Sequence, residues 1–111
     1  MSELNSLQQR IRDGLLLDAY SSLLTEKQRL ACEMTLLQDL SLSEAAESLG
    51  VSRQGVHDLV TRSREHMENC ERSLGLIEKN NILEEMENYL DENKDRLPQD
   101  FYDKFKIMLR A

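Results

Sequence analysis

The sequence has little of what interrupts helices and almost nothing that favours strands. Its 111 residues include one proline, four glycines and no tryptophan. Leucine, glutamate and methionine, which favour helix, are abundant, while strand signals are almost absent. The composition therefore predicts an all-α protein with one domain, or with a small domain and a helical extension.

Long apolar runs and a secretion signal are also missing. No run approaches the roughly 20 residues that span a bilayer, and the start lacks the basic, apolar and small-residue order of a signal peptide. We therefore expect a cytoplasmic protein without membrane insertion.

Cysteine is scarce as well, since only Cys32 and Cys70 are present. Their wide separation does not support a structural disulfide. His66 and Cys70 lie four residues apart on one predicted helix face, but a closed zinc site needs two more donors. Free thiols are the simpler interpretation, and we expect no metal and no other cofactor.

Positive charge is scarce too, because the net charge is −7 and no segment is net basic. Phosphate contacts supply most of the affinity of ordinary DNA-binding domains, so this charge favours a protein partner unless the basic residues gather on one face. The many carboxylates lie on charged helix faces without a recognisable nucleophile, phosphate loop or metal cluster. We therefore expect no enzyme activity.

What is present is the pattern of a helix-turn-helix. Ser41 can cap a first helix, and Glu44 can complete a capping box with it. Gly50 suits the sharp turn that ends this helix, because glycine readily adopts positive φ. Ser52 can then cap the next helix. This spacing predicts a second helix that stands outward and enters a nucleic-acid groove.

The same segment separates into a buried and an exposed set of residues. The positions expected to meet inside the two-helix corner are Ala45, Leu49, Val51, Val56 and Leu59. The positions expected outside it are Ser52, Arg53, Gln54, His57, Asp58 and Thr61. The first set predicts the corner, and the second set predicts what it can bind.

Helices are also expected on both sides of the motif. Apolar spacing predicts a helix over residues 1–24, and a capping box from Thr25 to Gln28 opens a supporting helix that ends near Asp39. The inward side chains of this supporting helix are expected to be Leu30, Met34 and Leu37. Together with the motif, it would form a compact three-helix unit.

The helix that begins at Ser52 is expected to continue to Gly75. Asn81 can cap a further helix, and Pro98 can open the last one. We expect a helix-turn-helix domain over residues 1–79, which includes the N-terminal helix, and a C-terminal helical pair over 80–111. The aromatic stripe within residues 101–109 would pack on its own domain or on a dimer partner.

Eight residues are candidate nucleic-acid contacts. They are Lys27, Arg29, Ser52, Arg53, Gln54, His57, Thr61 and Arg62. Arg53 suits guanine and Gln54 suits adenine, whereas His57 can donate to a base or a phosphate. Ser52 and the helix start can meet a phosphate. The alternative interpretation of the arginines is that they are ordinary solvated surface charges.

Five short runs carry a family resemblance. They are Leu24-Thr-Glu-Lys-Gln-Arg29, Asp39-Leu-Ser-Leu-Ser-Glu44, Gly50-Val-Ser-Arg-Gln54, Val56-His-Asp58 and Leu74-Gly-Leu-Ile-Glu-Lys79. Over residues 15–79 the chain resembles the bacterial YlxM-like helix-turn-helix proteins. That family is similar to the promoter-reading region of sigma factors, and its genes neighbour those of the signal recognition particle. The resemblance implies a regulatory or accessory role in co-translational protein targeting.

Two hypotheses follow for the function. In the first, Arg53, Gln54 and His57 read duplex DNA and the protein regulates transcription, with a homodimer matching paired half-sites. In the second, the same edge holds structured RNA or the protein component of the signal recognition particle, without sequence-specific DNA reading. The acidic, aromatic C-terminal segment would then make the protein contact.

Overall fold

A computed structural model describes residues 2–110, with side chains from residue 6 onward. Its elements, in chain order, are α1 (Ser2–Tyr20), η1 (Ser21–Leu23), α2 (Glu26–Cys32), η2 (Glu33–Leu37), α3 (Leu42–Leu49), α4 (Arg53–Leu74), α5 (Leu76–Glu92), η3 (Lys94–Arg96) and α6 (Gln99–Arg110). The described residues contain helices and no strand, which confirms the all-α prediction. The chain divides into two compact units, Met1–Gly75 and Leu76–Ala111.

The helix-turn-helix forms where the capping signals predicted it. The Ser41 side chain accepts a hydrogen bond from the Glu44 backbone at 3.1 Å, and the Glu44 carboxylate accepts one from the Ser41 backbone at 3.0 Å. Gly50 then ends α3 in the left-handed region at φ 69°. The Ser52 hydroxyl accepts from the Gly55 backbone at 2.9 Å and opens α4. Local sequence alone therefore fixes both ends of the corner.

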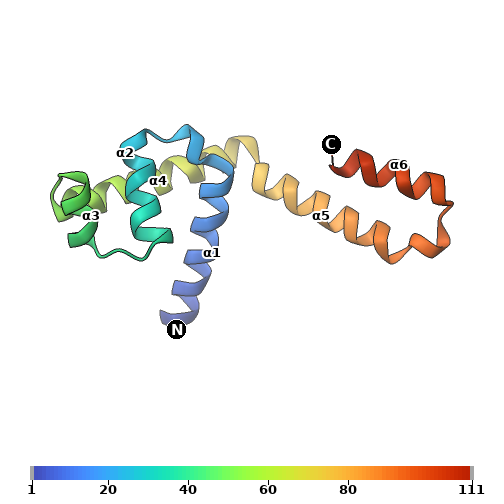
Figure 1. The fold of residues 1–111 in the computed structure, drawn as a ribbon, viewed down its shortest axis with the longest axis horizontal. Coiled ribbons are helices and arrows are strands. Elements are labelled where there is room, and N and C mark those ends of the chain that lie inside the picture. The colour runs from blue at the N-terminus through green and yellow to red at the C-terminus, as the bar shows by residue number, and fades with distance from the viewer. Residues whose placement is uncertain (1, 111) are drawn as a thin grey trace. The chain divides into compact units, whose positions relative to one another are not determined.

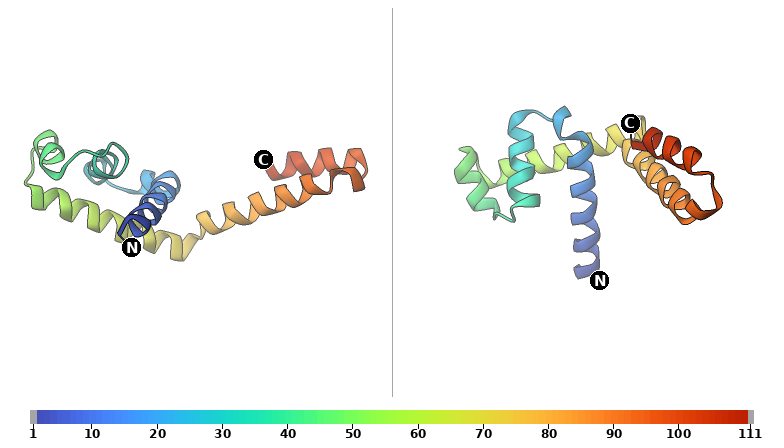
Figure 2. Two further views of the ribbon diagram at one scale, coloured as in Figure 1. Left: turned by 90° about the horizontal axis from the view of Figure 1, so that it is seen from below. Right: turned by 45° about the vertical axis from the view of Figure 1, so that its right-hand side comes forward.

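Helix α4 is the long element on which the rest of the first unit packs. Helices α1, α2 and α3 all contact it (Figure 1; Figure 2, left). The buried residues of this core are small, and they are Ala31, Ala45, Ala46, Val56 and Val60. Six larger side chains pack around them, namely Met34, Leu36, Leu42, Leu49, Val51 and Leu59. Alanine at the centre lets the helices approach closely, so the predicted corner residues do meet.

A second seam, made of polar groups, joins α1 to α4. Asp13 is only 1% exposed, and its carboxylate accepts two hydrogen bonds from the guanidinium of Arg64, at 3.1 and 2.8 Å. One turn along, the guanidinium of Arg12 donates two hydrogen bonds to Glu68, at 3.0 and 2.6 Å. A buried carboxylate is tolerated only when it is paired in this way. These contacts set the register of α1 on α4.

Helix α2 does not end as an ordinary α-helix. It widens into the π-helical turn η2, in which the backbone of Gln38 donates to the carbonyl of Glu33 at 2.9 Å. Asp39 then adopts φ 56° and stops the helix where the sequence predicted. The wider turn shifts the angular positions of the last residues, so the prediction that Leu37 faces inward is wrong, since Leu37 is 54% exposed.

The second unit is a helical hairpin of α5 and α6, joined by η3 (Figure 1, orange to red). The prediction that its first helix begins at Asn81 is wrong, because α5 begins at Leu76, directly after Gly75. Gly75 adopts φ 63° and ends α4 without any intervening loop. The cap signal at Asn81 was therefore redundant. The last helix follows Pro98 as predicted.

Charged groups fasten the two helices of this hairpin along one side. The ammonium of Lys106 lies 2.9 Å from Glu87 and 2.7 Å from Asp91. Arg110 pairs with Glu87 at 3.0 Å, and the hydroxyl of Tyr102 donates to Asp91 at 2.6 Å. Hydrogen bonds from Lys106 lower the pKa of both carboxyls. Among the described residues, no helix is both long and apolar enough to cross a bilayer.

Candidate nucleic-acid interface

The first turn of α4 presents three of the predicted contact residues together. Arg53, Gln54 and His57 are exposed and, with Leu42 at the start of α3, line one shallow hollow. Val56 and Val60 are four residues apart, so they share one face of the helix, and that face packs into the core. Gln54 and His57 lie two residues and one residue from Val56, so they point in other directions around the helix and stay outside the core. Arg53 is exposed as the first residue of the helix. The corner therefore holds a polar helix start outward on a packed base.

Asp58 organises two of these side chains. Its carboxylate accepts a hydrogen bond from the Gln54 amide at 3.0 Å and lies 3.8 Å from Nδ1 of His57. Asp58 lies outside the corner, as predicted, and its partner Gln54 is one helical turn away. Within residues 6–110, no carboxylate pairs with the guanidinium of Arg53, which remains exposed.

The remaining predicted contacts differ in how available they are. Lys27 is exposed in the first turn of α2, and Arg62 is exposed farther along α4. Thr61 is half-buried, and the Ser52 hydroxyl is occupied as the cap of α4. Arg29 is half-buried and pairs with Glu33 at 3.0 Å. Lys27 and Arg62 can thus meet a phosphate with the least rearrangement.

Leu42 was not predicted at this edge, and neither was the pairing of Asp58 with Gln54. Leu42 lines the hollow because it is the first residue after the cap at Ser41. Asp58 could have been recognised from its spacing of four from Gln54, which brings the two side chains together on a helix. The presence of glycine at position 55 also has a structural reason. An added Cβ would lie 3.1 Å from the Ser52 hydroxyl and 3.4 Å from the Val51 side chain.

Comparison with known proteins places this sequence in a family. Residues 7–106 match the family described as "helix-turn-helix protein, YlxM / p13 like". The chain belongs to this family. Helix-turn-helix architecture and family membership thus agree, as the short sequence runs predicted.

Members of the YlxM / p13 like family from several bacteria are similar along most of their length. A UPF0122 protein of Clostridium kluyveri is 43% identical over 79 residues, which cover 71% of each chain. One from Clostridium botulinum is 40% identical over 81% of this chain and 84% of its own. One from Staphylococcus haemolyticus is 47% identical over 68% of each chain. No solved structure matches this chain significantly.

The remaining polar candidates of this family member lie away from the helix start. Arg64 is held by the buried Asp13. Burial raises the pKa of the Cys32 thiol, so that it stays protonated inside the core. The Cys70 sulfur lies 3.9 Å from Nε2 of His66. The described residues contain no group of three or more side chains arranged to hold a metal ion.

Proposed function

We propose that the protein binds duplex DNA through the start of α4 and acts as a noncatalytic regulator. The observation that carries this proposal is the exposed trio of Arg53, Gln54 and His57 on the first turn of a helix held outward by the Gly50 bend. Recognition helices of this motif place their N-terminal side chains against base edges in the major groove. The Arg53 guanidinium can bond to guanine in a bidentate manner.

In this proposal, the other residues position the helix on the phosphate backbone. Lys27 and Arg62 are exposed cations, and they contact phosphates. The open backbone N–H groups at the start of α4, beside Ser52, attract a phosphate because the helix dipole is positive there. Gln54 reads adenine only after it leaves Asp58, so Asp58 limits its contribution.

A second candidate is supported by the charge of the protein. The chain carries −7 overall, and Arg12, Arg29 and Arg64 each pair with a carboxylate. Few cations are left for phosphates, so the main partner would be structured RNA or the protein component of the signal recognition particle. The resemblance to YlxM-like proteins, whose genes neighbour those of the particle, supports this candidate.

A binding titration separates the two candidates. Fluorescence anisotropy with labelled random duplex, and separately with the RNA of the signal recognition particle, is measured at two salt concentrations. Under the DNA proposal, Arg53→Ala weakens duplex binding about tenfold, the loss of one good base contact of roughly 1–3 kcal/mol. The matched control, Arg72→Ala, removes an arginine from the last turn of the same helix and changes affinity less than about twofold.

Three outcomes decide against DNA reading. Duplex binding that Arg53→Ala and Arg72→Ala weaken equally would indicate a general charge effect. Failure to bind any duplex would exclude the proposal. A complex with the protein component of the particle that is insensitive to salt and to Arg53→Ala would favour the second candidate instead.

A further inference from the structure

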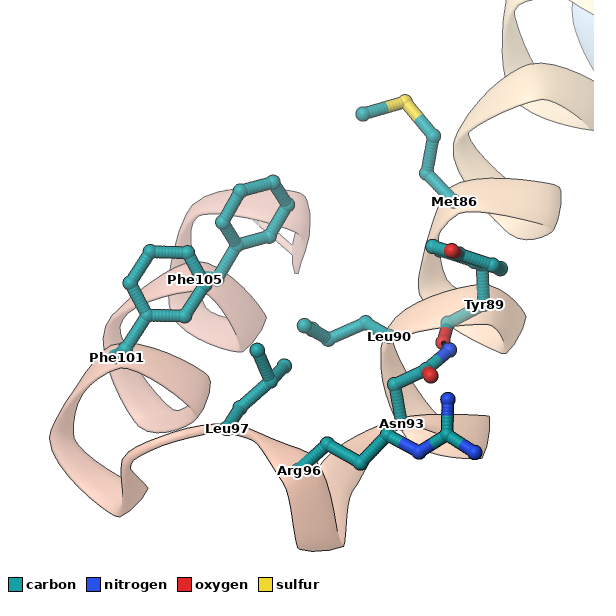
Figure 3. A pocket seen from close by; sticks show the side chains of 8 residues that line it. All are labelled: Met86, Tyr89, Leu90, Asn93, Arg96, Leu97, Phe101 and Phe105. Atoms are coloured by element: carbon teal, nitrogen blue, oxygen red, sulfur yellow. Dashed lines mark hydrogen bonds between the residues drawn. The ribbon is translucent and has the colours of Figure 1, made fainter.

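The hairpin of α5 and α6 leaves one of its faces apolar and open. A groove of about 340 Å³ is lined by Met86, Tyr89, Leu90, Asn93, Arg96, Leu97, Phe101 and Phe105. Leu90 and Leu97 point into the space between the helices, beside the rings of Phe101 and Phe105 (Figure 3). The polar groups of its lining are Asn93, Arg96 and the hydroxyl of Tyr89. The ion pairs of Lys106 join the helices elsewhere, so they do not cover this groove.

Apolar side chains continue the groove lining along both helices. Met86 is 42% exposed and Phe101 is 50% exposed, and Ile82, Leu83 and Met108 are exposed as well. On α5, residues 83, 86 and 90 repeat at alternating spacings of three and four, which is the pattern of a seam between packed helices. The face is thus built as half of a helix-packing interface.

The size of the unit indicates that this face is covered. Leu76–Ala111 spans 36 residues, and the buried residues described in α5 and α6 are Ile77 and Leu90 alone. Chains below about 40 residues rarely bury enough apolar surface to fold without a disulfide, a metal or a partner. The two cysteines of the chain lie outside this unit. Cover from another apolar surface is therefore the remaining source of stability.

We propose that the occupant is the same face of a second copy of this chain, so that two hairpins form a four-helix bundle. A two-fold pair needs a surface that is complementary to itself. This face meets that condition, because ridges of leucine, methionine and phenylalanine lie on both helices and no acidic residue lines the groove. Antiparallel hairpins pack in this way in four-helix bundles.

Charged residues beside the groove, on one side of α5 and one side of α6, fit the same pairing. Exposed Glu85 and Glu92, seven residues apart, share one side of α5 and flank Tyr89. Exposed Lys104 lies on α6 between Phe101 and Met108 at helical spacing. When α5 of one copy lies against α6 of the other, the acidic edge meets Lys104 twice, once at each side of the two-fold axis.

Another exposed apolar stripe in the chain offers a distinct alternative. In the first unit, Leu7 and Ile11 on α1 are more than half exposed. A dimer could instead form through this stripe. The stripe of one copy would then contact either the same stripe or the hairpin groove of the second copy. The self-pairing proposal predicts that α1 contributes nothing to the contact.

The test measures the mass of the full chain by sedimentation over a range of micromolar concentrations. The expected result is a dimer whose dissociation constant rises at least tenfold in Met86→Asp and in Phe101→Asp. The matched controls are Ile107→Asp, an equally radical change at a 70% exposed residue of α6 that does not line the groove, and Ile11→Asp on α1. Both controls leave the dimer intact. Circular dichroism verifies that every variant keeps its helix content.

A charge exchange tests the orientation of the pair. Glu85→Lys and Lys104→Glu each place like charges together in a homodimer, so each weakens it. An equimolar mixture restores opposite charges at both contacts, so it forms the heterodimer. A monomer at all concentrations, a dimer that survives Met86→Asp and Phe101→Asp, loss of the dimer in Ile11→Asp, or a mixture no tighter than its components would overturn the proposal.

Discussion

Single residues at the start of α4 determine both its shape and its charge. Gly55 lies in the first turn, where glycine costs about 1 kcal/mol of helix stability relative to alanine. The Ser52 hydroxyl and the Val51 side chain crowd the place that a Cβ would occupy. The glycine therefore accommodates the capping interaction, and its presence does not argue against a role for α4 in binding.

Asp58 provides a prediction about charge at the same site. Asp58→Asn removes a negative charge next to the proposed phosphate positions and keeps an oxygen that can accept from Gln54. We expect duplex affinity to rise roughly threefold to fivefold, which corresponds to about 1 kcal/mol of removed repulsion. Anisotropy titration at low salt measures this change. Glu65→Gln, the same loss of charge two turns farther along α4, serves as control, and an equal gain there would show that only net charge matters.

Gly50 provides a prediction about the turn. It adopts φ 69°, where a side chain is strained, so Gly50→Ala is expected to destabilise the protein by about 1 kcal/mol. Gly14 lies within α1, and an added Cβ there would meet nothing within 4 Å. Gly14→Ala is therefore expected to stabilise the protein by roughly 0.5–1 kcal/mol. Urea denaturation measures both, and midpoints that move in the same direction would contradict this account.

At the scale of elements, signals that act within a few residues were sufficient to predict helix ends. Contacts between residues far apart in the sequence could not be predicted in this way. Capping boxes at Thr25 and Ser41 and the glycine at position 50 predicted helix ends, because each acts within four residues. The pairing of Arg64 with Asp13 joins residues 51 positions apart. No local pattern encodes that distance, so the sequence alone does not predict this pair.

The same distinction explains the errors in individual elements. Asn81 carried a valid cap signal, but Gly75 allowed α5 to begin at once, and a cap inside a continuing helix has no effect. Leu37 matched the spacing of a regular helix, whereas the π-helical turn changed that spacing. Within the candidate site, the exposure of Gln54 and His57 follows from helical periodicity, whereas Arg53 is exposed because it is the first residue of α4. Their side-chain partners depended on rotamers, which the sequence does not specify.

The hairpin of α5 and α6 is expected to weaken in acid. The pKa values of Glu87 and Asp91 are lowered in the folded protein, chiefly by hydrogen bonds from Lys106. Their stabilising contribution is therefore complete above the unfolded values, near pH 4, and is lost as the pH falls through the folded values. NMR signals of α6 should shift or broaden over that interval. The variant Glu87→Gln with Asp91→Asn should lack this transition, and an identical transition in both proteins would place its cause elsewhere.

At the scale of the whole molecule, two units divide the surface chemistry. The first carries the exposed helix start, and the second carries the open apolar groove. The first unit has few unpaired cations, because most of its described arginines are held by carboxylates or amides. Affinity for nucleic acid would then depend on few phosphate contacts in each copy of the chain. A dimer presents two copies of the first unit, and this would raise the affinity through effective concentration.

This small number of contacts predicts a shallow salt dependence. Lys27, Arg53 and Arg62 are the exposed basic residues proposed for duplex binding. With phosphate contacts from Lys27 and Arg62, the logarithm of the binding constant should fall with the logarithm of salt concentration at a slope of about −2 for one copy of the chain, and of about −4 for a dimer. Lys27→Ala should make the slope shallower by about one for each copy of the chain. Titrations between about 50 and 200 mM salt measure it. A slope near zero would exclude phosphate contacts, whereas one far steeper than about −4 would require Arg12, Arg29 and Arg64 to leave their carboxylates on binding.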